Sequence, residues 1–152
     1  MRKDLKIDQD ILDKELWNLV LGYEIGYGRD RTVYMCALNT SFVIKVEYGE
    51  RSFQNRVEWE TWEYVSGGPY EKWFAPCYRI SPCGTLLFQK RTTPVQKLPK
   101  KLPAFFTDLK CENFGMFEGR LVCHDYGTIA ANIRRTFTKK TQTVPKSKRE
   151  WD

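Results

Sequence analysis

Residues 22–46 contain Gly22-Tyr-Glu-Ile-Gly-Tyr-Gly28, Thr32-Val-Tyr-Met-Cys-Ala-Leu38 and Phe42-Val-Ile-Lys-Val46. The first segment holds too much glycine for a helix interior and suits a strand that enters a sharp turn. The other two are rich in β-branched and aromatic residues, and Asn39-Thr-Ser41 between them is typical of a turn. This stretch therefore predicts an antiparallel meander of consecutive strands.

Helices are predicted on both sides of the meander. Apolar residues recur at helical spacing over 9–20, a helix that can run into the first strand, and again over 51–65, which ends at Ser66-Gly-Gly-Pro69. Short strands are predicted at 77–80 and 85–89, then a surface connector over 91–103 and a hairpin over 114–123. The predicted fold class is α+β, with one long helix packed against an antiparallel sheet.

Length and composition predict one globular domain, because the chain has 152 residues, of which 41% are hydrophobic and 29% charged. No apolar run approaches the roughly 18 residues that a membrane span needs. The first residues lack the uninterrupted apolar region of a secretory signal. We therefore expect a cytoplasmic protein without a membrane partner.

Histidine and cysteine usage excludes several kinds of site. His124 is the single histidine, so a multi-histidine metal site cannot form within one chain. A Ser-His-Asp or Cys-His hydrolase would have to use His124 itself. The five cysteines include no Cys-x-x-Cys pair, so we expect reduced and mostly buried thiols.

The positive charge is concentrated near the end of the sequence. Residues 128–152 hold seven basic and two acidic residues, so they carry +5 of the net charge of +6. We predict a basic tail over 128–152, which could contact nucleic acid with the help of Phe137 and Trp151, an acidic partner, or nothing. From about Lys139 onward we expect it to be mobile or held by a partner chain, since it has few large apolar residues.

Several polar residues of the predicted sheet and helix suggest phosphate chemistry. Gly26 and Gly28 could let backbone N–H groups approach phosphate oxygens, although such a pair commonly marks only a hairpin. Lys45 lies within an apolar strand, where a lysine either snorkels at an edge or points into a cleft. Glu58 is the best placed counter-charge on the following helix, and otherwise it is a solvated surface residue.

The strongest signal lies in Thr107-Asp-Leu-Lys-Cys-Glu-Asn113 and Cys123-His-Asp-Tyr-Gly127. The predicted hairpin between these segments could bring Asp108, Asn113 and Asp125 together. Phosphoryl transfer needs two carboxylates and an amide at one point. One carboxylate orients the attacking hydroxyl, while the other carboxylate and the amide ligate magnesium.

In this order the residues resemble the motifs of the protein kinase superfamily, especially short kinase-like proteins of tailed bacteriophages, over about residues 16–127. The resemblance implies a minimal kinase-like domain over 1–127, with an amino lobe, a catalytic-loop hairpin and a strongly reduced carboxy lobe. It implies ATP and Mg²⁺ as cofactors. It implies a phosphate loop that contains Gly26, Gly28, Arg31 and Val33, and a catalytic ion pair of Lys45 with Glu58 in which Lys45 binds phosphate. It also implies catalytic roles for Asp108 and Lys110. The implied magnesium ligands are Asn113 and Asp125.

The sequence departs from the kinase pattern in ways that leave the function open. Arg31 stands where the third glycine would be, no His-Arg precedes Asp108, and only 25 residues follow Gly127. The first hypothesis is a phosphotransferase, serine/threonine-type by virtue of Lys110, that acts on a host protein or on itself. The alternative is a catalytically inactive scaffold that binds and modulates a host protein. Under either hypothesis, we expect Lys45 and Glu58 to form an ion pair that faces one cleft, across from Asp108 and Asp125.

Overall fold

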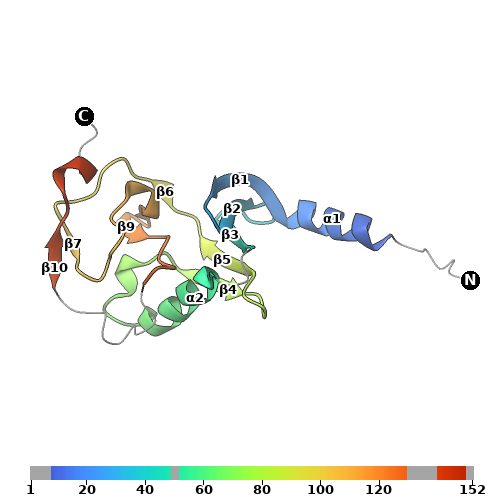
Figure 1. Ribbon diagram of the computed structural model, residues 1–152, viewed down its shortest axis with the longest axis horizontal. Coiled ribbons are helices and arrows are strands. Elements are labelled where there is room, and N and C mark those ends of the chain that lie inside the picture. Colours follow the sequence, from blue (N-terminus) through green and yellow to red (C-terminus); the bar gives the residue numbers. More distant parts are fainter. Residues whose placement is uncertain (1–7, 49–51, 130–139, 150–152) are drawn as a thin grey trace, which may run out of the picture.

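The main sheet is five-stranded and antiparallel in the computed structural model, which describes residues 8–48, 52–129 and 140–149 (Figure 1). Its order is β1-β2-β3-β5-β4, built from β1 (Leu21–Tyr27), β2 (Arg31–Cys36), β3 (Phe42–Glu47), β5 (Leu86–Lys90) and β4 (Cys77–Ile80). Each neighbouring pair is antiparallel. The predicted meander over 22–46 is confirmed, and the later two strands extend the sheet beyond β3.

Helix α2 (Gln54–Val65) packs against β3, β4 and β5. The helix expected over 51–65 is confirmed from Gln54 onward, and Arg51 lies outside the described residues. The Glu47 carboxylate accepts from the first backbone N–H groups of the helix, at 2.8 Å from Gln54 N and 3.0 Å from Asn55 N, where no intrahelical partner exists. The buried face is largely polar, and its members are Asn55, Glu58, Thr61 and Val65.

Helix α1 (Gln9–Val20) runs directly into β1, as its sequence pattern predicted. Asp8 caps it by accepting from Asp10 N at 3.0 Å. None of its residues is buried, and Figure 1 shows the helix projecting beyond the sheet. Large apolar side chains remain exposed along it, among them Ile11, Leu16 and Leu19.

Smaller sheets complete the α+β fold. Strands β6 (Thr93–Pro94), β8 (Phe114–Phe117) and β9 (Arg120–Cys123) form one sheet, and β7 (Lys101–Pro103) pairs with β10 (Thr141–Thr143) in another. The predicted hairpin over 114–123 is confirmed, and its turn places Glu118 and Gly119 at φ values of 49° and 75°. Short 3₁₀ helices occur at η1 (Glu71–Trp73), η2 (Cys111–Asn113) and η3 (Lys146–Lys148).

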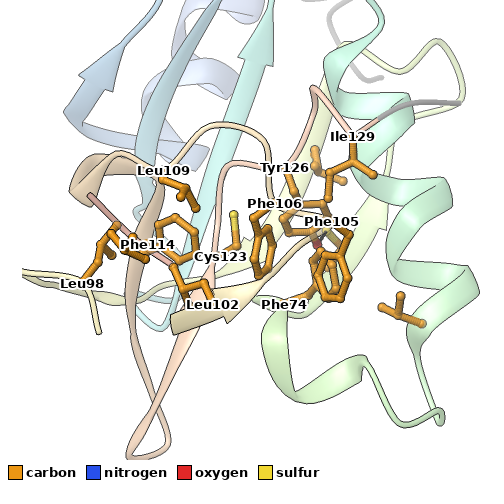
Figure 2. Packing of buried hydrophobic residues seen from close by; sticks show 14 residues of the cluster. Phe74, Leu98, Leu102, Phe105, Phe106, Leu109, Phe114, Cys123, Tyr126 and Ile129 are labelled. Carbon is orange, nitrogen blue, oxygen red and sulfur yellow. Dashed lines mark hydrogen bonds between the residues drawn. The ribbon is translucent and has the colours of Figure 1, made fainter. Parts of the chain in front are cut away.

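An aromatic core joins α2, β4 and β5 to the segments that follow β5 (Figure 2). Ring centroids of neighbouring side chains lie between 4.7 and 5.8 Å apart, and the rings are those of Phe74, Phe105, Phe106, Phe114 and Tyr126. Leu98 and Leu102 are buried in the same cluster. The prediction of a surface connector over 91–103 is therefore wrong for these leucines, because that segment crosses the core.

The basic tail departs from its prediction. Over 140–149 it is packed on the chain itself, since β10 pairs with β7 and Val144 is fully buried in the aromatic cluster. Strand pairing satisfies the backbone polar groups, so one buried valine suffices to anchor a segment with little other apolar area. The expectation that this part cannot pack is wrong. Lys139 lies outside the described residues, as do Arg134, Arg135, Phe137 and Trp151.

No helix among the described residues is long and apolar enough to cross a membrane.

Candidate functional site

Lys45 and Glu58 form the predicted ion pair. Lys45 lies in the middle of β3, and its Nζ donates to Glu58 Oε2 on α2 at 2.7 Å. Asn55, one turn before Glu58, fixes the helix to the sheet because its Nδ2 lies 3.1 Å from Lys45 O and 2.9 Å from Thr85 O. The lysine therefore points inward toward α2, and the alternative of an edge lysine that snorkels to solvent is wrong.

Arg31 is the unexpected member of the site. It begins β2 and is buried, with its Nη2 at 2.8 Å from Glu58 Oε1 and 2.7 Å from Asp125 Oδ1. Its Nη1 donates to Asn55 Oδ1 at 3.2 Å. The sequence indicated only that an arginine replaces a glycine of the phosphate loop, and no local pattern showed that its side chain turns into the protein.

We call Arg31, Lys45, Glu58 and Asp125 the four-charge centre. Its formal charges cancel, with two cations and two carboxylates. Burial alone would raise the pKa of Glu58, but Arg31 and Lys45 outweigh it and hold that pKa below its usual value. Burial would likewise lower the pKa of Arg31, yet Glu58 and Asp125 raise it above its usual value.

Glu58 also accepts from the backbone of the segment that follows β9. The N–H groups of Tyr126 and Gly127 each lie 3.2 Å from Glu58 Oε1. Lys45 Nζ donates in addition to the carbonyl oxygen of His124. The Glu58 carboxylate thus joins the main sheet, α2 and residues 124–127. Its partners matter because a buried charge without a partner would be costly.

Asn113 brings the predicted loop residues together. Its carbonyl oxygen accepts from His124 N at 2.9 Å and from Asp125 N at 3.3 Å, and its Nδ2 donates to Asp108 O at 3.1 Å. Asn113 therefore links the backbone of Asp108 to the backbone of Asp125. The Asp108 carboxylate itself pairs with Lys110 Nζ at 3.2 Å, and both side chains are substantially exposed.

His124 is a structural link within this arrangement. Its Nε2 lies 2.6 Å from Glu112 O, which can only accept, so Nε2 carries the proton and Nδ1 accepts from Thr92 Oγ1 at 2.7 Å. Burial, with Lys45 nearby, lowers the pKa of His124. Burial also raises the pKa of the adjacent Cys123 thiol well above its usual value, which disfavours a Cys-His nucleophile.

The glycine turn is a closed hairpin between β1 and β2. Gly28 N donates to Arg31 O at 2.7 Å, so this N–H group is used within the turn. Gly26 lies opposite half-buried Val33, and a Cβ at Gly26 would touch nothing within 4 Å. The open space over Gly26 leaves room for a ligand, whereas Gly28 offers no free backbone donor.

The expected open cleft is absent at the ion pair. Within the described residues, Lys45 is 2% exposed and Glu58 0%, whereas the Asp125 side chain is 44% exposed. Asp125 is therefore the member of the centre that solvent reaches. A separate surface groove of about 520 Å³ is lined by none of the predicted site residues; its lining is Thr40, Ser41, residues 90–94, Phe117 and Glu118.

The residues expected to hold magnesium are already partly engaged in other contacts. Asp125 Oδ1 accepts from Arg31, and Asn113 donates through its amide nitrogen to Asp108 O, a contact that does not use its Oδ1. Across the described part of the chain, no group of three or more His, Cys, Asp or Glu side chains is placed to hold a metal ion. Mg²⁺ requires several oxygen ligands in octahedral geometry, and here the one candidate carboxylate is already paired with a cation.

No protein-family model matches this sequence, and no curated protein matches it significantly.

Proposed function

We propose that the chain is a minimal kinase-like protein that binds ATP by its phosphates and transfers the γ-phosphoryl group to a hydroxyl of a host protein or of itself. The main sheet with α2 corresponds to an amino lobe, the β8–β9 hairpin to the catalytic loop region, and little remains of a carboxy lobe. The observation that carries the proposal is the Lys45–Glu58 pair at 2.7 Å, which joins β3 to α2.

The site residues have distinct roles in this proposal. Lys45 is buried and held by Glu58, so in this proposal its charge acts on the phosphates from beneath the surface, and the phosphates approach from the exposed side of Asp125. Asp108 accepts the proton of the attacking hydroxyl. The oxygen of that hydroxyl bonds to the γ-phosphorus, while the bond between this phosphorus and the ADP oxygen breaks and ADP leaves. Lys110, 3.2 Å from Asp108, offsets charge on the transferred group. Both side chains are accessible, as a macromolecular hydroxyl substrate requires.

The test uses folded, monodisperse protein with γ-labelled ATP, in magnesium and in chelator. We expect Asp108→Asn to retain ATP binding but to slow label transfer by about 10²–10⁴-fold, the usual contribution of a positioned base. Glu112→Gln is the matched control, because it neutralises an exposed carboxylate in the same loop and should transfer label as wild type does. Wild-type protein that neither binds ATP nor transfers label contradicts the proposal.

A catalytically inactive scaffold is the second candidate, and the Arg31 bridge favours it because it closes the centre. Exposed apolar side chains on α1 and β1 supply contact area for a host protein, among them Ile11, Leu16, Leu19, Tyr23 and Tyr27. On this reading Asp108→Asn leaves partner binding unchanged, whereas Tyr27→Ala, which truncates an 82% exposed ring, weakens it. Label transfer by wild type that Asp108→Asn removes argues against this candidate.

A further inference from the structure

The side chain of Arg31 is built into the four-charge centre. One nitrogen, Nη2, donates to carboxylates of two different segments, Glu58 on α2 and Asp125 after β9. The other, Nη1, donates to Asn55, which is fully buried and itself fixed to the backbone of Lys45. Moving this guanidinium away would break all of these hydrogen bonds together.

The charge balance of the centre depends on Arg31. With Arg31 in place, two cations face two carboxylates, and Glu58 has no exposure to water. A divalent cation at Asp125 would lie beside the guanidinium and be repelled by it at short range in a partly buried site. If Arg31 left to admit the metal, the buried Glu58 would lose one of its cations.

We infer that Arg31 is the resident cation of this centre and that it excludes a divalent metal ion from Asp125. Exclusion of the metal follows from the contacts of Arg31 and stands without the proposed function.

The experiment titrates Mn²⁺ alone into the protein and follows free Mn²⁺ by electron paramagnetic resonance. We expect Arg31→Gln, which keeps hydrogen-bonding capacity but loses the charge, to bind Mn²⁺ about tenfold or more tightly than wild type. Arg29→Gln is the matched control, since Arg29 lies in the same hairpin turn with a 94% exposed side chain and should leave Mn²⁺ affinity at the wild-type level. Adding Asp125→Asn to Arg31→Gln should remove the gain.

Equal Mn²⁺ affinity of wild type and Arg31→Gln overturns the inference, as does a gain that survives Asp125→Asn. If circular dichroism shows that Arg31→Gln does not fold, wild type decides the matter. Saturable Mn²⁺ binding by wild type that Asp125→Asn abolishes overturns the inference, and no such binding supports it.

Discussion

The guanidinium of Arg31 and the carboxylate of Asp125 lie 2.7 Å apart although 94 positions separate them in the sequence. Arg31 begins β2, and Asp125 follows β9, so the contact ties the main sheet to the hairpin segment. Because the same nitrogen reaches Glu58 on α2, three parts of the fold meet at one side chain. The stability of the fold and the chemistry of the candidate site therefore depend on the same group of charges.

Replacing Glu58 by glutamine should lower the free energy of unfolding by about 3–5 kcal/mol, because it leaves Arg31 and Lys45 buried without their shared carboxylate. Urea denaturation measures the change. Glu63→Gln, on the exposed face of the same helix, should change stability by no more than about 0.5 kcal/mol. Equal effects of the two substitutions would show that the buried Glu58 carboxylate adds no more to the free energy of unfolding than an exposed one.

Gly127→Ala should displace the start of α2. A Cβ at position 127 would lie 2.9 Å from Gln54 Cβ and 3.2 Å from both Gln54 Cα and Gln54 O, contacts that backbone atoms cannot relieve locally. We expect a loss of about 1–3 kcal/mol in unfolding free energy, as for overpacking. Gly26→Ala, whose Cβ meets nothing within 4 Å, serves as the control and should cause no such loss.

His124 should make stability depend on pH near neutrality. Burial lowers its pKa in the folded protein, whereas the unfolded chain titrates near the ordinary value of about 6.5. Below about pH 6.5 the unfolded chain takes up a proton that the folded protein does not, so the free energy of unfolding falls as pH decreases toward the folded pKa. The lowered pKa of Glu58 acts separately, at pH values below the ordinary carboxylate pKa.

Urea denaturation at pH values from about 8 to 5.5 measures this slope, which lies around the ordinary histidine pKa. His124→Gln should flatten it, because no group then titrates at that position. A slope that persists unchanged in His124→Gln would assign it to another residue.

Cys83 should be the cysteine that alkylating reagents modify first at neutral pH. It is exposed, and hydrogen bonding by Thr85 lowers the pKa of its thiol to about 7. Cys77 is buried, and burial raises the pKa of its thiol to about 12. Iodoacetamide labelling followed by peptide mass spectrometry should place the fast label on Cys83, and Thr85→Val should slow it. Fast labelling of Cys77 in the folded protein would contradict the burial described here.

Val144→Ala should destabilise the protein by about 1–3 kcal/mol, because Val144 is fully buried in the aromatic cluster and anchors β10 on β7. Thr143→Ala removes an exposed side chain of the same strand and should change stability by less than about 0.5 kcal/mol. Thermal unfolding of both variants tests whether the packed tail contributes to the stability of the fold.

The elements with a strong local pattern could be predicted from the sequence. The meander over 22–46, α2 and the β8–β9 hairpin follow from β-branched runs, helical spacing and turn residues, which act over a few positions. The pairing of Lys45 with Glu58 could also be predicted, but from the order of the kinase-like motifs, because the strand itself left an edge lysine possible.

Only the tertiary structure decided where Arg31, Leu98 and Val144 lie. The sequence pattern predicts a phosphate loop at Arg31, a surface connector at Leu98 and a mobile or partner-bound tail at Val144, yet all three residues are buried. Burial of a guanidinium depends on carboxylates that converge from distant segments, here Glu58 and Asp125, and no short stretch of sequence encodes that convergence. Likewise, β10 packs because β7 offers a free edge, so its order comes from a partner strand about forty residues away rather than from its own composition.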